Sequence, residues 1–233
     1  MPSSNAGVQR VVIPEIMDRD EGTVQEIDRA LRDLRRINRW FGGISTTSMM
    51  LQQVAGKRRS NRLSMLDVGA GSGDVALAAR SAMQRLGIGL EVTLADRSLL
   101  HLRMALPAAR KIVGDASALP FASASFDLVS CSLLAHHLEP EELIAFVAQA
   151  LRICRVAVLI NDLRRSAVSL ALVYAGFPMF CRIVRHDGAA SVRRAYTIPE
   201  MRQMLERVGA GFEITPHYLF RMGAIVWKDE TRN

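Results

Sequence analysis

The stretch MLDVGAGSGD, residues 65–74, places one carboxylate and three glycines close together. Asp67 stands in an apolar run, and Gly69, Gly71 and Gly73 follow it at every second position. A glycine-rich turn between a strand and a helix lets the backbone approach a bound nucleotide closely. Two phosphate-binding patterns fail, because Asp74 stands where a dinucleotide fingerprint needs its last glycine, and the Gly-Lys-Ser/Thr ending of a P-loop is missing. The turn therefore predicts a nucleotide site of another kind.

Three further segments carry polar residues at the ends of expected strands. Asp96 ends the second of these strands, 23 residues after Gly73, where a group that only accepts hydrogen bonds can take both hydroxyl hydrogens of a ribose. The segments VGDASALPF (113–121) and FDLVSCSLLAHHL (126–138) follow. These segments occur in this order within residues 65–138.

In this order the segments resemble the motifs of class I S-adenosylmethionine (SAM) dependent methyltransferases. The resemblance implies that Asp67 acts near the ammonium group of SAM and that Asp96 binds its ribose. It also implies that Asp115 and the Ala116 amide face the adenine, and that residues 126–138 lie beneath the sulfonium. S-adenosylhomocysteine (SAH) would be the product. The expected cofactor-binding residues are Asp67, Gly69, Ala70, Gly71, Gly73, Asp96, Arg97, Asp115, Ala116 and Ser132.

Two histidines are the candidate catalytic residues. Methyl transfer needs the acceptor held in line with the methyl group, and a phenol with a pKa near 10 also benefits from a base. His136 and His137 lie in the loop after the fourth expected strand, and the unperturbed pKa of histidine suits this role near neutral pH. We expect His137 to be the base. The alternative, that both histidines only hydrogen-bond backbone around a helix start, stays open.

The segment after the fifth expected strand is the candidate acceptor site. The apolar run 167–181 has arginines on both sides, which indicates an amphiphilic acceptor with an apolar body and an anionic or phenolic head. A core helix with solvated ends, or a helix lying on a membrane surface, fits the same pattern. The resemblance also implies that the N-terminal helices close over the cofactor from the other side, with Arg39, Trp40 and Phe41 as the expected contacts. The expected substrate-binding residues are Asn161, Arg164, Tyr174, Arg185, His186 and Tyr196.

The segments LRDLRRINRWFGG, INDLRRS and RHDGAASVRRAYT resemble a narrower group. They are similar to small-molecule methyltransferases of the ubiquinone/menaquinone-biosynthesis type, in particular a bacterial group often encoded beside type III polyketide synthases. This resemblance implies a lipidic phenol, quinone precursor or polyketide acceptor, with O-methylation favoured over C-methylation. A SAM-binding scaffold protein is a rival. An RNA or DNA base methyltransferase is disfavoured, because SCSLLAHH lacks the proline-containing motif of such enzymes.

An alternation of strands and helices is expected to position these residues. Strands are expected at 63–69, 90–96, 111–113, 126–132, 156–162, 212–220 and 222–228. Helices are expected at 74–87, 98–110, 140–153 and 197–209, the last opening with a Thr197/Glu200 capping box. The last two strands form an antiparallel pair. This pattern predicts a Rossmann-like, seven-stranded, mostly parallel α/β sheet with one antiparallel strand near the C-terminus and helices on both faces.

The first sixty residues are expected to be helical. One helix begins at the Thr23/Glu26 capping box, with its apolar residues on one face, and ends at Gly42-Gly43; a second, short helix holds Met49, Leu51 and Val54. We therefore predict a helical N-terminal cap over 1–60 and a SAM-binding domain over 61–233, with a lid at about 163–195.

Composition narrows the remaining classes. The chain of 233 residues has a net charge of +7, but only three of its 30 basic residues are lysine and its arginines are spread out, so nucleic-acid binding is disfavoured. Three cysteines without a Cys-x-x-Cys spacing argue for a reducing compartment, and no metal site is expected. The apolar run of 15 residues is too short to span a bilayer, and no signal peptide is recognised. A cytoplasmic protein is expected; peripheral membrane contact and a homodimer stay open.

Overall fold

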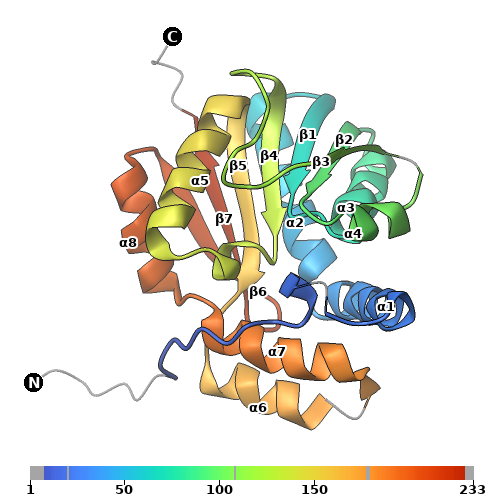
Figure 1. Ribbon diagram of the computed structural model, residues 1–233. Helices are drawn as coiled ribbons and strands as arrows, with labels where there is room; N and C mark the ends of the chain where they lie inside the picture. Colours follow the sequence, from blue (N-terminus) through green and yellow to red (C-terminus); the bar gives the residue numbers. More distant parts are fainter. Residues whose placement is uncertain (1–7, 20, 108, 177–178, 229–233) are drawn as a thin grey trace, which may run out of the picture.

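A seven-stranded sheet with the order β3-β2-β1-β4-β5-β7-β6 forms the centre of the computed structural model (Figure 1). The structure describes residues 8–19, 21–107, 109–176 and 179–228. Strands β1 to β5 run parallel, and β7 is antiparallel to both of its neighbours, β5 and β6. This confirms the predicted fold class. The strands are β1 (Arg62–Val68), β2 (Gly89–Asp96), β3 (Arg110–Val113), β4 (Phe126–Ser132), β5 (Cys154–Leu163), β6 (Phe212–His217) and β7 (Arg221–Trp227).

Helices cover both faces of the sheet and its carboxyl edge. One face carries α2 (Gly43–Arg58), α3 (Asp74–Arg85) and α4 (Leu99–Met104), and the other carries α5 (Pro140–Ile153) and α8 (Ile198–Val208). Helices α1 (Val24–Trp40), α6 (Ala167–Gly176) and α7 (Arg182–Arg194) lie beyond the carboxyl ends of the parallel strands, at the bottom of Figure 1. Two single turns of 3-10 helix are η1 (Met17–Arg19) and η2 (Ala135–His137).

The core consists of two apolar layers, one on each side of the sheet. Phe146 on α5 packs in the layer that includes Val129 and Ile160, and Leu51 on α2 packs in the layer that includes Leu94. Helices on both faces bury both sides of the central strands, which is why β5 reads as a continuous apolar run instead of an alternating one. Because α2 packs into this core, the second helix of the predicted N-terminal cap is part of the sheet's own packing.

Local sequence signals place several helix ends correctly. The capping boxes Thr23/Glu26 and Thr197/Glu200 are both formed, and Pro140 is the first residue of α5. Two predicted helices differ in length. The helix expected at 98–110 ends at Met104, because Pro107 cannot continue it and favours extended backbone before it. The helix expected to be short, α2, has 16 residues.

In the described residues before α1, the single turn η1 is the only helical element, whereas the sequence predicted a mainly helical segment over the first sixty residues. This N-terminal strap, residues 8–19, runs across α7. The Val11 amide donates to the Arg193 carbonyl (3.2 Å), and the Asp187 carboxylate accepts the amides of Ile16 (2.9 Å) and Met17 (3.1 Å). Contacts with a distant helix, which no local periodicity encodes, therefore hold the strap.

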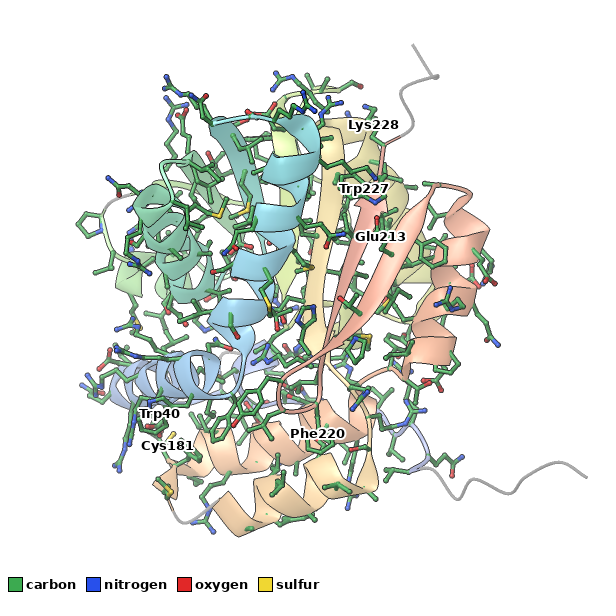
Figure 2. The ribbon with its side chains drawn as sticks, turned by 180° about the vertical axis from the view of Figure 1, so that it is seen from behind. Trp40, Cys181, Glu213, Phe220, Trp227 and Lys228 are labelled. Carbon is green, nitrogen blue, oxygen red and sulfur yellow. The ribbon has the colours of Figure 1, made fainter. Side chains whose placement is uncertain are left out.

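Helix α1 is joined to the start of α7 by a residue near its middle. The Asp33 carboxylate on α1 accepts the amide of Cys181, the residue before α7 (2.8 Å). Trp40, at the end of α1, lies on the same side of the molecule as Cys181, and Phe220 lies above the lid helices (Figure 2). In the described part of the chain, no helix is both long and apolar enough to cross a membrane.

A fully buried arginine connects β7 with β5 and α1. The Arg221 guanidinium donates to Asn38 Oδ1 (2.8 Å), to the Phe41 carbonyl (3.2 Å) and to Asn161 Oδ1 (3.4 Å). Burial lowers the pKa of Arg221 to about 10, so the group is still charged at neutral pH. The cation is thus compensated by neutral acceptors and by the nearby Asp162 carboxylate.

We predict that Arg221→Met lowers the free energy of unfolding by about 3 kcal/mol, because three acceptors lose a charged donor in the interior. Urea denaturation of the variant and of the wild type measures this difference. Arg85→Met, at an exposed position on α3, is the matched control and is expected to stay within about 0.5 kcal/mol of the wild type. Equal stability of Arg221→Met and the control would contradict the proposed role of Arg221.

Candidate active site

A cavity of about 900 Å³ lies at the carboxyl edge of the sheet. Its walls come from the glycine turn after β1, the ends of β2 and β4, helix α1, the lid helices α6 and α7, and the N-terminal strap. Open parallel sheets bind ligands at this edge. Eleven of the twelve residues expected to bind cofactor or to catalyse line the cavity: Asp67, Gly69, Ala70, Gly71, Asp96, Arg97, Asp115, Ala116, Ser132, His136 and His137.

The glycine turn depends on backbone conformations that favour glycine. Gly69, Gly71 and Gly73 have φ values of +66°, +54° and +72°. A Cβ at Gly69 would lie 3.0 Å from Leu134 Cδ1, whereas a Cβ at Gly71 would meet nothing within 4 Å. Gly73 does not line the cavity; it is the N-cap residue of α3. The open space at Gly71 fits a ligand lying against the backbone.

Asp67 is a buried carboxylate with an unused oxygen. Burial, reinforced by the nearby Asp74 and Asp96 carboxylates, outweighs a hydrogen bond with Ser130 and raises the pKa of Asp67 to about 7. Among the described residues, Asp67 Oδ1 has no hydrogen-bond partner. Such an oxygen suits a cationic ligand group, which would supply the missing partner and favour the ionised carboxylate.

Asp96 and Asp115 shape the two loops beside the turn. Asp96 Oδ2 accepts the Gly71 amide (2.7 Å) and Oδ1 accepts the Ser98 amide (2.8 Å), so this carboxylate ties the glycine turn to the end of β2. Asp115 Oδ1 accepts the Ser117 amide (2.8 Å), and this bond lowers the pKa of Asp115. Carboxylates have further lone pairs, so each of them retains acceptor sites for a ligand.

His136 is fully buried between two carboxylates. Its Nδ1 lies 2.6 Å from Asp162 Oδ1, and its backbone amide donates to Asp162 Oδ2 (2.9 Å). Its Nε2 lies 3.7 Å from Glu15 Oε1 and has no hydrogen-bond partner among the described residues. Burial would lower the pKa of His136, but Asp162 and Glu15 outweigh burial and raise it to about 10.

His137 is the more accessible of the two histidines, with a side chain 20% exposed. Its Nδ1 lies 2.9 Å from Asp18 Oδ2, and its Nε2 lies 3.8 Å from Glu15 Oε2. Arg194 donates to the His137 carbonyl (2.6 Å) and to Asp18 Oδ2 (3.2 Å). The centres of the two imidazole rings are 4.2 Å apart, so the two histidines together form one polar end of the cavity.

Glu15 and Asp18 on the strap were not among the predicted site residues. Both line the cavity and contact the histidine pair, although they are more than 110 residues away in the chain. No motif or periodicity marks them, and only the docking of the strap on α7 brings them here. Asp162, at the end of β5, lies behind the cavity lining with its carboxylate turned to His136.

The six predicted substrate-binding residues lie outside the cavity lining. Asn161 is buried and donates to the Gly43 carbonyl (2.7 Å) and Thr47 Oγ1 (2.8 Å), and Tyr196 donates to the Leu138 carbonyl (2.8 Å). These two side chains are therefore engaged in packing that the sequence did not reveal.

The other four predicted substrate residues are at or near the surface. The Arg164 guanidinium lies 5.8 Å from the ring centre of Phe220, which itself lines the cavity. The Tyr174 hydroxyl accepts a hydrogen bond from Arg193 (3.2 Å), His186 Nδ1 lies 2.8 Å from Asp187 Oδ1, and Arg185 is exposed.

An apolar wall faces the polar end instead. Helix α1 contributes Leu31, Leu34 and Ile37, and Phe41 follows it. The lid contributes Leu172, Val173, Phe180, Val184 and Val192. Of the three residues expected at the end of α1, only Phe41 lines the cavity, while Trp40 is half-exposed and stacks with Arg36 (5.0 Å).

Comparisons with known proteins agree with this geometry. Residues 65–156, less than half of the chain, match the family described as "Methyltransferase domain". No curated protein matches at a significant level. Similar solved structures include a SAM-dependent methyltransferase from Aquifex aeolicus (14% identity; 89% of this chain and 100% of that chain; TM-score 0.61).

Two further similar structures are also methyltransferases. The plantazolicin methyltransferase BamL, solved with SAH, has 18% identity over 92% of this chain and 93% of that chain, with a TM-score of 0.66. The CurJ carbon methyltransferase has 12% identity over 91% of this chain and 62% of that chain, with a TM-score of 0.65. These likenesses show the fold of the chain, and the match to the methyltransferase domain covers its residues 65–156. The narrower ubiquinone-type grouping stays a prediction.

We predict that Asp67→Asn increases the free energy of unfolding, and by more at pH 8 than at pH 5. The folded-state pKa of Asp67 is raised to about 7, above the value of about 3.9 for an unfolded chain, so its contribution to stability falls as pH rises between these two values. Asparagine carries no charge at either pH. Urea denaturation at both pH values measures the difference, and an equal effect at pH 5 and pH 8 would contradict the raised pKa.

Proposed function

We propose that the protein transfers a methyl group from SAM to an oxygen of a small, hydrophobic or amphiphilic acceptor of the phenol, quinone-precursor or polyketide type. The observation that carries this proposal is that one cavity joins three features. These are the glycine turn with its carboxylates, the histidine pair, and the apolar wall of α1 and the lid. Cofactor and acceptor sites are thereby continuous, as in-line transfer requires.

The residues around the turn fit SAM. Asp67, with its unused oxygen, would bind the ammonium group, and the backbone at Gly69 to Gly71 would lie against the amino-acid and ribose parts. Asp96 would accept the ribose hydroxyls, and Asp115 the adenine amino group. Ser132, whose buried Oγ has no partner among the described residues, is a further contact. Bound SAM supplies a methyl group on a positively charged sulfur.

The acceptor would lie with its apolar body against Leu34, Ile37 and Leu172 and with its oxygen at His137. This arrangement follows from the separation of apolar and polar lining. His137 promotes loss of the acceptor proton, and His136, held by Asp162, positions it. The lid over 163–195 would close the acceptor side of the domain 61–233, with Arg164, Arg185, Tyr174 and His186 near its outer rim.

Transfer to carbon is the second candidate. The likeness to the CurJ carbon methyltransferase and to the CMeT domain of the citrinin polyketide synthase favours it. In both reactions the acceptor atom, oxygen or carbon, loses a proton and faces the methyl group of SAM. The same polar end of the cavity would therefore assist both reactions. Identification of the methylated atom in the product by NMR distinguishes the two.

We predict micromolar binding of SAH and no binding of NAD in calorimetry. Asp96→Asn is expected to weaken SAH at least tenfold, because it replaces one acceptor oxygen with a donor. Glu213→Gln, at an exposed position on β6 at the other end of the sheet (Figure 2), is the control and should bind as the wild type does. Binding of NAD, or no binding of SAH, would contradict the cofactor assignment.

We predict that His137→Gln lowers kcat by about 10²–10⁴-fold on a phenolic acceptor, since a proton-accepting group is lost, with SAH affinity unchanged. Transfer of a radiolabelled methyl group to a panel of lipidic phenols and polyketide aromatics measures kcat. His217→Gln on β6 is the matched control. Full activity of His137→Gln would remove its assigned role, and SAH binding without turnover on any acceptor would favour the scaffold alternative.

A further inference from the structure

We propose that Glu15, His136 and His137 form a binding site for a divalent first-row transition metal ion, with an open side facing the acceptor end of the cavity. Each of the three residues offers one ligand atom, and these atoms lie within 4.8 Å of one another. Two imidazoles and a carboxylate are a common ligand set for Zn²⁺ and Fe²⁺. Metal binding is independent of the proposed function, whereas the role of the ion in activating the acceptor rests on it.

The spacing of the three residues favours an ion over direct hydrogen bonds. The Nε2 atoms of His136 and His137 lie 3.7 and 3.8 Å from the two Glu15 oxygens, which is beyond hydrogen-bond distance. Two ligands of one tetrahedral ion, each about 2.1 Å from the metal, lie about 3.4 Å apart. The three ligand atoms lie within 4.8 Å of one another, so a movement of about 1 Å or less of each side chain would bring them to ligating distance.

An unpartnered nitrogen is the second, independent observation. His136 is 1% exposed, and its Nε2 has no hydrogen-bond partner in the described part of the chain, although it is aimed at Glu15. An unsatisfied buried polar group costs about 1–3 kcal/mol. A metal ion between His136 and Glu15 would satisfy this nitrogen.

The surroundings have the arrangement typical of metal-binding histidines. A carboxylate holds Nδ1 of each ring, Asp162 at 2.6 Å for His136 and Asp18 at 2.9 Å for His137, which leaves both Nε2 atoms for an ion. Ser191 Oγ donates to Glu15 Oε1 (2.8 Å) and orients the third ligand.

The charges around the pair also favour a cation. Three carboxylates contact the two imidazoles, those of Glu15, Asp18 and Asp162, while one guanidinium, that of Arg194, lies beside His137. Arg97 reaches Asp18 from the solvent side. An ion would bind His136 in its neutral form, and the three carboxylates then outnumber the two guanidiniums beside the cavity, which favours a cation there.

The location gives such an ion a function. Glu15, His136 and His137 line the same cavity as the cofactor residues. A divalent ion lowers the pKa of a hydroxyl placed on its open side, so a phenolic acceptor there would release its proton to water before methyl transfer. With the ion bound, His137 would promote loss of this proton as a ligand of the metal instead of accepting the proton itself. The substrate class would then be oxygen acceptors that can reach a metal, such as phenols with a neighbouring hydroxyl or carbonyl group.

The test is calorimetric titration of the chelator-treated full chain with Zn²⁺, together with the metal content after dialysis and the visible spectrum with Co²⁺. One ion per chain is expected. Glu15→Gln, which keeps the shape and the Ser191 contact, should weaken Zn²⁺ by about 100-fold or more. Asp18→Asn should weaken it by about 10–100-fold, because it removes a carboxylate that orients His137. Glu213→Gln should bind as the wild type does.

Two outcomes would overturn the proposal: no Zn²⁺ binding by the wild type, or binding that survives in both Glu15→Gln and His137→Gln. Thermal unfolding and SAH calorimetry on the same samples show whether each variant is folded. SAH binding without metal binding would refute the metal site and leave the proposed function intact, whereas metal binding without SAH binding would refute the cofactor assignment alone.

Discussion

The contact between Asp162 and His136 is the interaction on which the polar end of the cavity depends. Asp162, at the end of β5, accepts both the ring Nδ1 (2.6 Å) and the amide of His136, and so fixes the loop after β4 against the sheet. Burial would raise the pKa of Asp162, but His136 outweighs it and keeps the pKa low. Since buried ion pairs contribute little net stability, the main effect of this contact is to fix the position of the His136 ring and its loop. It sets where both imidazoles face.

The N-terminal strap completes what this contact begins. Glu15 and Asp18 reach the histidines only because Asp187 on α7 accepts the amides of Ile16 and Met17. The strap, the lid helix and the histidine loop therefore form one contact network, in which each part orients the next. Substituting Asp187 would disturb the histidine pair without touching it, through the loss of two amide partners on the strap.

The parts of the site that the sequence predicts are those encoded locally. The turn from Gly69 to Gly73 and the carboxylates at strand ends are read from short motifs, because the same few residues determine both conformation and position. Glu15 is different, since its role depends on a strap that docks on a helix about 170 residues away. Asn161 and Tyr196 were predicted to bind the acceptor, because they stand at a strand end and beside the lid. Their side chains instead hydrogen-bond the carbonyls of Gly43 and Leu138. The alternation of strands and helices followed from periodicity, whereas the order of the strands and the lengths of α2 and α4 did not.

Unsatisfied polar atoms are concentrated around the cavity, and this concentration carries a physical meaning. Asp67 Oδ1, Ser132 Oγ and His136 Nε2 are all buried without partners in the described residues, and Asp67 also has a raised pKa. Each costs free energy in the unliganded fold, which folding alone does not explain. Two of these atoms belong to residues of the proposed cofactor site, and the third, His136 Nε2, faces Glu15 at the proposed acceptor side. A ligand that supplies the missing partners removes this cost in free energy when it binds. Ligands that place a cation at Asp67 and at His136 would therefore stabilise the folded protein as well as react in it.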